Sequence, residues 1–309
     1  MKRIFLAASA LLTGASGLVM NSQPKLKAGQ CNVLALSGGG AFGAVEMGML
    51  DGLTSTNTIP TNYDIITGIS AGGLNAGFLS YYVNVSQALP DIYNILSNLT
   101  TADVYQSAVL DILSEWSYYS TKPLANSLAN ILANKVPEAG SPMTLVGASN
   151  VLEQRLDVWH FDELALADKL SVLLATSAIP LVFPPQKINN SLYVDGGVIS
   201  NEMIHQAIGQ LACDSYQVVF ISASGRNQTA LPMPSGLFSY IGSIVSLLVS
   251  TFDYQLAQPT SCSYPRGSIL ACFPTAPSLE NFSILNFDYG AQLYQLGKEA
   301  YSCTSMQLC

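Results

Sequence analysis

The chain has 309 residues, with 12 Lys and Arg against 20 Asp and Glu, which gives a formal net charge of −8. Hydrophobic residues make up 49% and charged residues 10%, a composition that excludes an intrinsically disordered chain. An acidic chain without basic clusters is also a poor partner for nucleic acid, so that class of function is excluded.

The N-terminus has the form of a secretory signal peptide. Lys2 and Arg3 precede an apolar run at 4–12, and small residues follow up to Gly17. The run is too short for a permanent membrane span, so cleavage near this point is expected. Loss of the two basic residues would change the net charge from −8 to −10. The sequence therefore predicts a signal peptide at 1–17 and a protein that is secreted or held in the secretory-pathway lumen.

A glycine-rich loop follows the first predicted strand, at residues 32–37, and precedes a predicted helix at 44–53. The glycines of this loop are Gly38, Gly39, Gly40 and Gly43. Consecutive N–H groups facing inward can hold a phosphate or a carbonyl oxygen that becomes anionic. The Lys and Ser/Thr of a phosphate loop are absent, which favours the oxyanion. A turn that only packs the helix on the sheet is the remaining alternative.

A second strand-turn-helix unit carries a candidate nucleophile. A strand is predicted at 63–67, the string Gly-Ile-Ser-Ala-Gly occupies 68–72, and a helix is predicted at 71–83. The sharp turn needs small neighbours, which Gly68 and Gly72 provide. The positive end of the helix favours the oxyanion of acyl transfer. This pattern predicts a serine hydrolase with Ser70 as nucleophile.

The middle of the chain is interpreted as structural. Residues 86–135 show helical spacing and are expected to help roof the site, and a strand is predicted at 144–149. The prolines Pro180, Pro184 and Pro185 are expected to fix a rigid turn before the next strand.

A carboxylate lies at the end of a predicted strand at 192–194. Asp195 is followed by Gly196 and Gly197. An Asp in this position can act as a general base, or it can cap the helix predicted at 200–211.

The two histidines offer an alternative mechanism. His205 follows Asp195 in the order serine, acid, histidine of an α/β-hydrolase triad. It lies, however, two to three turns along the predicted helix, away from the loop of Asp195. His160 is flanked by aromatic residues and is interpreted as a surface or packing residue. We expect neither histidine to be catalytic.

The C-terminal third contains an apolar segment of uncertain role. A strand is predicted at 217–223 and a terminal helix at 288–301. Between them, residues 237–252 form an uncharged helical pattern with a thin stripe of serines. Such a helix is either buried in the core or serves as a lid that contacts lipid, and it is too short to span a bilayer.

Six cysteines in a secreted chain suggest disulfides. The expected pairs are Cys262 with Cys272, Cys303 with Cys309, and Cys31 with Cys213. Sequons for N-glycosylation occur at Asn84, Asn98, Asn189, Asn227 and Asn281. Asn189 is expected to be the least occupied because it is close to the strand of Asp195.

The alternation of strands and helices predicts a three-layer α/β/α fold with a largely parallel central sheet, and reactive groups beyond the carboxyl ends of the strands. No linker divides the chain, so residues 18–309 are expected to form a single domain. No spacing resembles a metal site, and neither a metal nor a cofactor is expected.

Four motifs in this order resemble the patatin-like phospholipases over residues 32–301. They are the glycine loop, the Ser70 string, the run Ala-Thr-Ser-Ala-Ile-Pro-Leu-Val-Phe-Pro-Pro at 175–185, and Asp-Gly-Gly at 195–197. The resemblance implies a patatin-like fold and a Ser/Asp dyad, in which Ser70 attacks an ester carbonyl and Asp195 takes its proton. Gly39 and Gly40 would supply the oxyanion N–H groups. Phe42 replaces an Arg or Lys of many relatives, which should affect head-group preference more than catalysis.

The function implied is that of a secreted lipid acyl hydrolase of the phospholipase A type. It would cleave carboxyl esters of glycerolipids or phospholipids at a membrane or micelle surface, through an acyl-enzyme on Ser70. The negative net charge favours apolar contact with neutral or zwitterionic lipids. Two alternatives remain: a soluble ester or thioester hydrolase with the same dyad, and a non-enzymatic storage or lipid-binding protein on the same fold.

Overall fold

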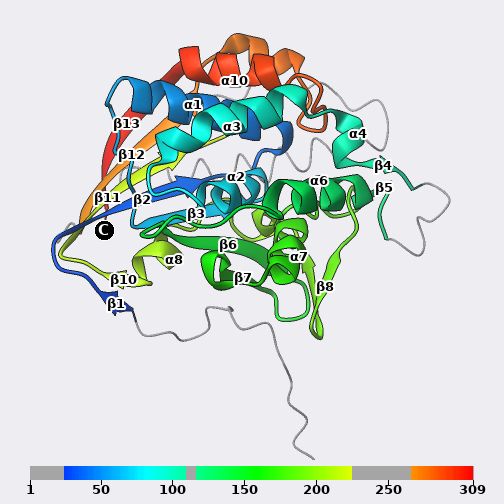
Figure 1. Ribbon diagram of the computed structural model, residues 1–309, viewed down its shortest axis with the longest axis horizontal. Helices are drawn as coiled ribbons and strands as arrows, with labels where there is room; N and C mark the ends of the chain where they lie inside the picture. The colour runs from blue at the N-terminus through cyan, green and yellow to red at the C-terminus, as the bar shows by residue number, and fades with distance from the viewer. Residues whose placement is uncertain (1–23, 109–115, 225–265, 309) are drawn as a thin grey trace, which may run out of the picture.

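The computed structural model describes residues 24–108, 116–224 and 266–308 (Figure 1). Several predictions lie wholly outside these ranges or involve residues outside them. They are the signal peptide at 1–17, the apolar helix at 237–252, the sequon at Asn227, the pairings of Cys262 and Cys309, part of the helical region at 86–135 and part of the single domain at 18–309.

The described residues form a central sheet of nine strands. The strands are β2 (Gln30–Leu36), β3 (Ile65–Ile69), β6 (Met143–Asn150), β7 (Arg155–His160), β8 (Gln186–Ile188), β9 (Ser191–Val194), β11 (Ser215–Ile221), β12 (Gly267–Pro274) and β13 (Tyr301–Leu308). Their order is β13-β12-β11-β2-β3-β6-β9-β8, and β7 also pairs with β6. The five strands from β12 to β6 are parallel, and the others join antiparallel. The prediction of a largely parallel sheet is confirmed.

Helices flank this sheet. They are α1 (Gly43–Ser55), α2 (Ala71–Leu79), α3 (Val85–Asn98), α4 (Thr101–Val104), α6 (Lys122–Leu132), α7 (Leu166–Thr176), α8 (Ile204–Ile208) and α10 (Gly290–Glu299). Figure 1 shows α1, α3 and α10 stacked over one side of the sheet and α8 on the other. Two small two-stranded sheets are separate from the central sheet. They pair β1 (Lys25–Leu26) with β10 (Leu211–Ala212), and β4 (Gln106–Ser107) with β5 (Tyr119–Ser120). In the ranges described, no helix is both long and apolar enough to cross a bilayer.

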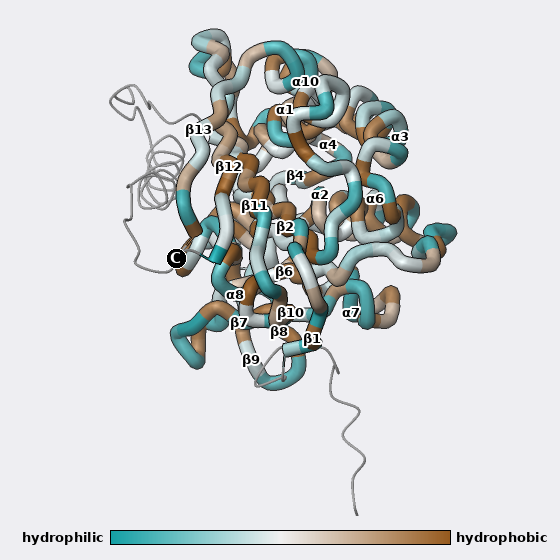
Figure 2. The backbone as a smooth tube through the Cα atoms, turned by 90° about the vertical axis from the view of Figure 1, so that its left-hand side faces the viewer, coloured by the Kyte–Doolittle hydropathy of each residue, from teal (hydrophilic) through white to brown (hydrophobic). Residues whose placement is uncertain are grey.

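Strand β2 shows why the sheet needs cover on both faces. Side chains alternate along a strand, so Leu34 and Leu36 join the hydrophobic core that contains Leu50 of α1. Val33 and Ala35 point to the opposite side and join the core beneath α8. Continuous hydrophobicity of this kind is typical of a parallel strand that is buried on both faces. Figure 2 shows the same concentration of hydrophobic residues along β11 and β12.

The predicted strands at 32–37, 63–67, 144–149, 192–194 and 217–223 correspond to β2, β3, β6, β9 and β11, with ends shifted by up to two residues. The helical region at 86–135 divides into α3, α4 and α6, with the β4 and β5 pair between them. The helix predicted at 200–211 is shorter than expected, since α8 spans only Ile204–Ile208. The predicted rigid turn before β8 is present, and Phe183 N–H donates to the carbonyl of Ile179 (2.8 Å).

The disulfide prediction was partly wrong. Cys31 and Cys213 form a disulfide, as expected. Cys272, however, pairs with Cys303, so the expected pairs Cys262–Cys272 and Cys303–Cys309 are both wrong. The reason is that β12 and β13 run antiparallel and place Cys272 directly opposite Cys303, with 4.1 Å between the Cα atoms. The expected pairs joined cysteines that are close in the sequence, and this choice did not take the register between β12 and β13 into account.

Candidate active site

Ser70 lies on the turn between β3 and α2, with φ 53° and ψ −124°. A positive φ is costly for a residue with a side chain and is typical of a nucleophile on a strained turn. The turn is possible because its neighbours are glycines. A Cβ atom at Gly68 would lie 2.1 Å from the carbonyl oxygen of Gly72. Thr176 Oγ1 holds the turn by accepting a hydrogen bond from the Ser70 N–H (2.9 Å).

Asp195 reaches Ser70 because β3 and β9 both pair with β6. β3 runs parallel to β6 as far as Gly147, whereas β9 runs antiparallel and pairs with Ser149 and Asn150. β7 occupies the other edge of β6, so β3 and β9 share one edge and point towards each other. The residues that follow these two strands therefore meet. Ser70 Oγ donates a hydrogen bond to Asp195 Oδ2 at 2.6 Å.

The Asp195 carboxylate is buried and held on both oxygens. Oδ1 accepts a hydrogen bond from the Gly197 N–H (2.8 Å), so the side chain also caps the short turn that follows. The Asp195 N–H donates to the carbonyl of Ala178 (2.8 Å). Burial raises the pKa of Asp195 from 3.8 to about 6, and the hydrogen bonds from Ser70 and Gly197 act in the opposite direction. The carboxylate is thus a stronger base than an exposed Asp and is still ionised at neutral pH.

The glycine loop presents two backbone N–H groups. The N–H of Gly38 is occupied, because it donates to Asn201 Oδ1 (2.9 Å). No described residue accepts a hydrogen bond from the N–H of Gly39 or Gly40, and both residues are partly exposed. Gly40 has φ +56°, and a Cβ atom there would lie 2.2 Å from the carbonyl oxygen of Ile284. N–H groups without an acceptor are candidate donors to a developing oxyanion.

The other motif glycines allow close packing around the pair. A Cβ atom at Gly43 would lie 3.0 Å from the Cβ of Ala71, next to the nucleophile. One at Gly196 would lie 2.8 Å from the carbonyl oxygen of Gly147 on β6. Side chains at these positions would push apart the elements that carry Ser70 and Asp195.

Neither histidine contacts the pair. His205 is exposed on α8, and His160 is buried at the end of β7. The Nδ1 atom of His160 has no hydrogen-bond partner among the described residues. The direct hydrogen bond between Ser70 and Asp195 also leaves no intervening imidazole.

Sequence reasoning missed Asn201, which fixes the glycine loop. This buried amide accepts from the N–H of Gly38 (2.9 Å), and its Nδ2 donates to the carbonyl of the same residue (3.4 Å). Its Oδ1 would lie 3.4 Å from a Cβ atom at Gly197. Asn201 therefore joins the loop to the segment that carries Asp195. The only sign of this role in the sequence was an amide side chain six residues after Asp195.

Substitution of Asn201 by Asp is expected to lower kcat for a soluble ester by about tenfold to a hundredfold. The second carboxylate oxygen would face the Gly38 carbonyl, which repels it, and the loop would shift. Steady-state kinetics would show the loss in kcat with little change in KM. Ser200→Ala is the matched control, because Ser200 Oγ donates to the Glu202 carbonyl and not to the loop. Wild-type kcat in Asn201→Asp would contradict this positioning role.

A buried carboxylate was also missed. Glu46, in the first turn of α1, is fully buried. It accepts hydrogen bonds from the Ser37 N–H (2.7 Å) and from Asn75 Nδ2 (2.8 Å). Asn75 belongs to α2, the helix that begins after Ser70. Glu46 therefore ties the start of the glycine loop to the helix of the nucleophile.

Phe42 is partly buried and packs against the hydrophobic core that contains α1. Among the described residues, no group of three or more His, Cys, Asp or Glu could hold a metal ion.

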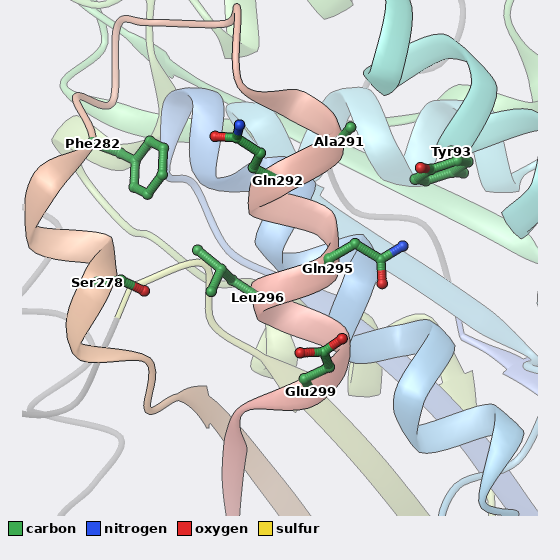
Figure 3. A pocket seen from close by; sticks show the side chains of 8 residues that line it. All are labelled: Tyr93, Ser278, Phe282, Ala291, Gln292, Gln295, Leu296 and Glu299. Carbon is green, nitrogen blue, oxygen red and sulfur yellow. The ribbon is translucent and has the colours of Figure 1, made fainter.

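A groove separate from Ser70 and Asp195 lies between α3, α10 and the short 3-10 helix at Pro277–Asn281 (Figure 3). It measures about 500 Å³ and is lined mainly by apolar atoms, with Tyr93, Phe282 and Leu296 among its residues. Neither Ser70 nor Asp195 lines it.

The fold is of the mixed α/β class with a mostly parallel central sheet, and comparison with known proteins gives the family. Residues 34–208 match the patatin-like phospholipases, and the chain belongs to this family. It is 28% identical to the probable lipid hydrolase 463L of Invertebrate iridescent virus 6 over 199 residues, which are 59% of this chain and 65% of the viral protein. It is 22% identical to the uncharacterized protein R571 of Acanthamoeba polyphaga mimivirus, over 72% of this chain and 78% of that protein.

Solved structures that match this chain include VipD from Legionella pneumophila, with 14% identity and a TM-score of 0.36. That comparison covers 97% of this chain and 73% of VipD. Human GIVD cytosolic phospholipase A2 gives 11% identity and a TM-score of 0.39, over 87% of this chain and 57% of that protein.

Proposed function

We propose that this protein is a secreted lipid acyl hydrolase of the phospholipase A type, with Ser70 as nucleophile and Asp195 as general base. The observation that carries the proposal is the 2.6 Å hydrogen bond from Ser70 Oγ to a buried carboxylate. Membership of the patatin-like phospholipases supports lipid esters as the substrate class. The Cys31–Cys213 and Cys272–Cys303 disulfides support an oxidising, secretory location.

The first half of the reaction forms an acyl-enzyme. As Ser70 Oγ bonds to the ester carbonyl carbon, its proton passes to Asp195 Oδ2. The carbonyl oxygen becomes an oxyanion, which accepts hydrogen bonds from the N–H groups of Gly39 and Gly40. When the carbonyl re-forms, the bond to the alcohol oxygen breaks, and Asp195 returns the proton to that oxygen. The products are a lysolipid and an ester of Ser70.

The second half regenerates the enzyme. A water molecule gives a proton to Asp195 and attacks the acyl carbon, the same N–H groups stabilise the second oxyanion, and Ser70 leaves with the proton from Asp195. Since a carboxylate with a pKa of about 6 is a weak base for a hydroxyl, the oxyanion contacts must lower much of the barrier.

Covalent labelling followed by lipid analysis tests the proposal. A fluorophosphonate should label wild-type protein at Ser70, which peptide mass spectrometry would locate, and Ser70→Ala should not be labelled. Mass spectrometry of a mixed phospholipid substrate should then show free fatty acids and lysolipids. Folded protein that neither reacts with the probe nor releases fatty acid would refute the proposed function.

The proposed mode of lipid contact predicts a weak salt dependence. With a net charge of −8 and few basic residues, binding to phosphatidylcholine vesicles should change by less than about twofold between 0.05 and 0.5 M NaCl. Vesicle sedimentation would measure the bound fraction at each salt concentration. A steep loss of binding with salt would instead indicate attraction to charged head groups.

A further inference from the structure

Two large apolar side chains are exposed on segments that lie side by side at the edge of the molecule. Trp116 is 60% exposed and Leu181 is 64% exposed. They come from segments far apart in the chain, which are joined by a bridge between Ser117 and Leu181. We call Trp116 and Leu181 the apolar tip. Figure 1 shows β4 and β5, the pair next to Trp116, at the outer edge of the molecule.

The backbone holds the apolar tip in place. The N–H of Tyr118 donates to the carbonyl of Leu181 (2.9 Å), and the N–H of Tyr119 donates to the carbonyl of Val182 (3.0 Å). Both tip residues have positive φ, 54° at Trp116 and 67° at Leu181. This conformation is costly for large side chains, and such strain is typical of functional positions. The backbone therefore holds the two apolar side chains of the tip in a fixed position, exposed to solvent.

A small hydrophobic cluster connects the tip to Asp195. Ile179, Val182 and Phe183 form this cluster, directly beside Leu181 in the chain. The residue before it, Ala178, accepts the hydrogen bond from the Asp195 N–H (2.8 Å).

The same cluster also reaches the glycine loop. Leu285 packs on it, and the carbonyl of Leu285 accepts a hydrogen bond from Tyr105 OH (2.7 Å). The neighbouring Ile284 carbonyl accepts from the Ala41 N–H (2.8 Å). The buried cluster next to Leu181 is thus linked, through backbone hydrogen bonds of neighbouring residues, to the segment of Asp195 and to the glycine loop.

We propose that the apolar tip is the surface through which this protein contacts aggregated zwitterionic phospholipid. The inference rests on the proposed function, because an acyl chain that leaves a lipid aggregate for Ser70 needs an apolar route out of water. Trp and Leu both favour the boundary between head groups and acyl chains. The tip carries no charge and the chain is acidic, so the matching surface is zwitterionic and not anionic.

Substitution of both tip residues by Asn tests this contact. Asn tolerates positive φ, so Trp116→Asn and Leu181→Asn remove the apolar surface and keep the backbone. Val136→Asn is the matched control. Val136 is 81% exposed and lies before the amino end of β6, whereas Ser70 and Asp195 lie towards its carboxyl end.

Binding is measured in the Ser70→Ala background with phosphatidylcholine vesicles, so that no lipid is hydrolysed. Each tip variant should lose about tenfold in vesicle affinity and the double variant about a hundredfold, whereas Val136→Asn should bind as before. In the active background, hydrolysis of vesicles should fall in parallel, while a soluble short-chain ester is cleaved within about twofold of the wild-type rate.

Tryptophan fluorescence gives an independent readout. The chain has two tryptophans, and Trp159 is buried, so a blue shift on addition of vesicles reports Trp116. The shift should disappear in Trp116→Phe, which keeps an apolar ring and should still bind vesicles.

Unchanged vesicle affinity in the double variant, or the absence of a blue shift in bound protein, would overturn the inference. Either result would be compatible with the proposed roles of Ser70 and Asp195 and would favour a protein as the partner of the tip. Conversely, vesicle binding that depends on the tip in a protein that cleaves no ester would support the inference and refute the proposed function.

Discussion

Replacing Ser70 by Ala is expected to lower kcat/KM for phospholipid hydrolysis by about 10⁴-fold or more, because the reaction loses its nucleophile. Asp195→Asn should cause a loss of about 10³-fold to 10⁴-fold, since the amide has the same shape but cannot accept the serine proton. The two losses should not add in the double variant, because both residues serve one proton transfer. Release of fatty acid from phosphatidylcholine would be measured for each protein.

The histidines provide the control for this dyad. His160→Gln and His205→Gln should keep kcat/KM within about threefold of wild type, because neither side chain contacts Ser70 or Asp195. A loss at either histidine as large as that of Ser70→Ala would show that a triad operates in place of the dyad.

The second large effect is a gain in stability when Asp195 is replaced. The folded-state pKa of about 6 lies above the ordinary value of 3.8, so the folded protein binds this proton more tightly than the unfolded chain does. The resulting stabilisation is complete below about pH 4 and is lost as the pH rises through about 6. A shift of this size corresponds to about 3 kcal/mol in the free energy of unfolding.

Asp195→Asn removes this titration, while its side-chain oxygen can still accept from Gly197. The variant should therefore be more stable than wild type by up to about 3 kcal/mol at pH 7.5 and should show no gain at pH 4. Urea unfolding at the two pH values measures the difference. An equal change at both values would mean that the burial of the charge is not its cause. Wild-type kcat/KM should fall about tenfold per pH unit below pH 6, as the base becomes protonated.

Local motifs in the sequence were sufficient to single out the two side chains that the structure brings together. Ser70 and the glycines beside it share one strand-turn-helix unit, and Asp195 ends its own strand, so each could be assigned without knowledge of the tertiary structure. Asn201 could not, because its partner Gly38 is 163 residues away. Glu46 was missed for a different reason: its burial depends on how α1 packs against α2, which periodicity does not show.

The buried parallel strands β2, β3 and β11 were predicted from their apolar residues, whereas β13 is largely exposed and has no such signal. The buried strand β12 was missed as well, although it is parallel to β11. The antiparallel pairing of β12 with β13 also places Cys272 opposite Cys303. Because β13 was not predicted, the disulfide that depends on it was not predicted either.

Because β3 and β9 share one edge of β6, Ser70 and Asp195 meet only when both strands are in place. A nascent chain that has already formed β3 and α2 has Ser70 on its turn but no base, because Asp195 arrives only when β9 docks on the remainder of that edge. On the proposed function, the catalytic arrangement would therefore form only when both strands have joined β6, and a partly synthesised chain would be inactive.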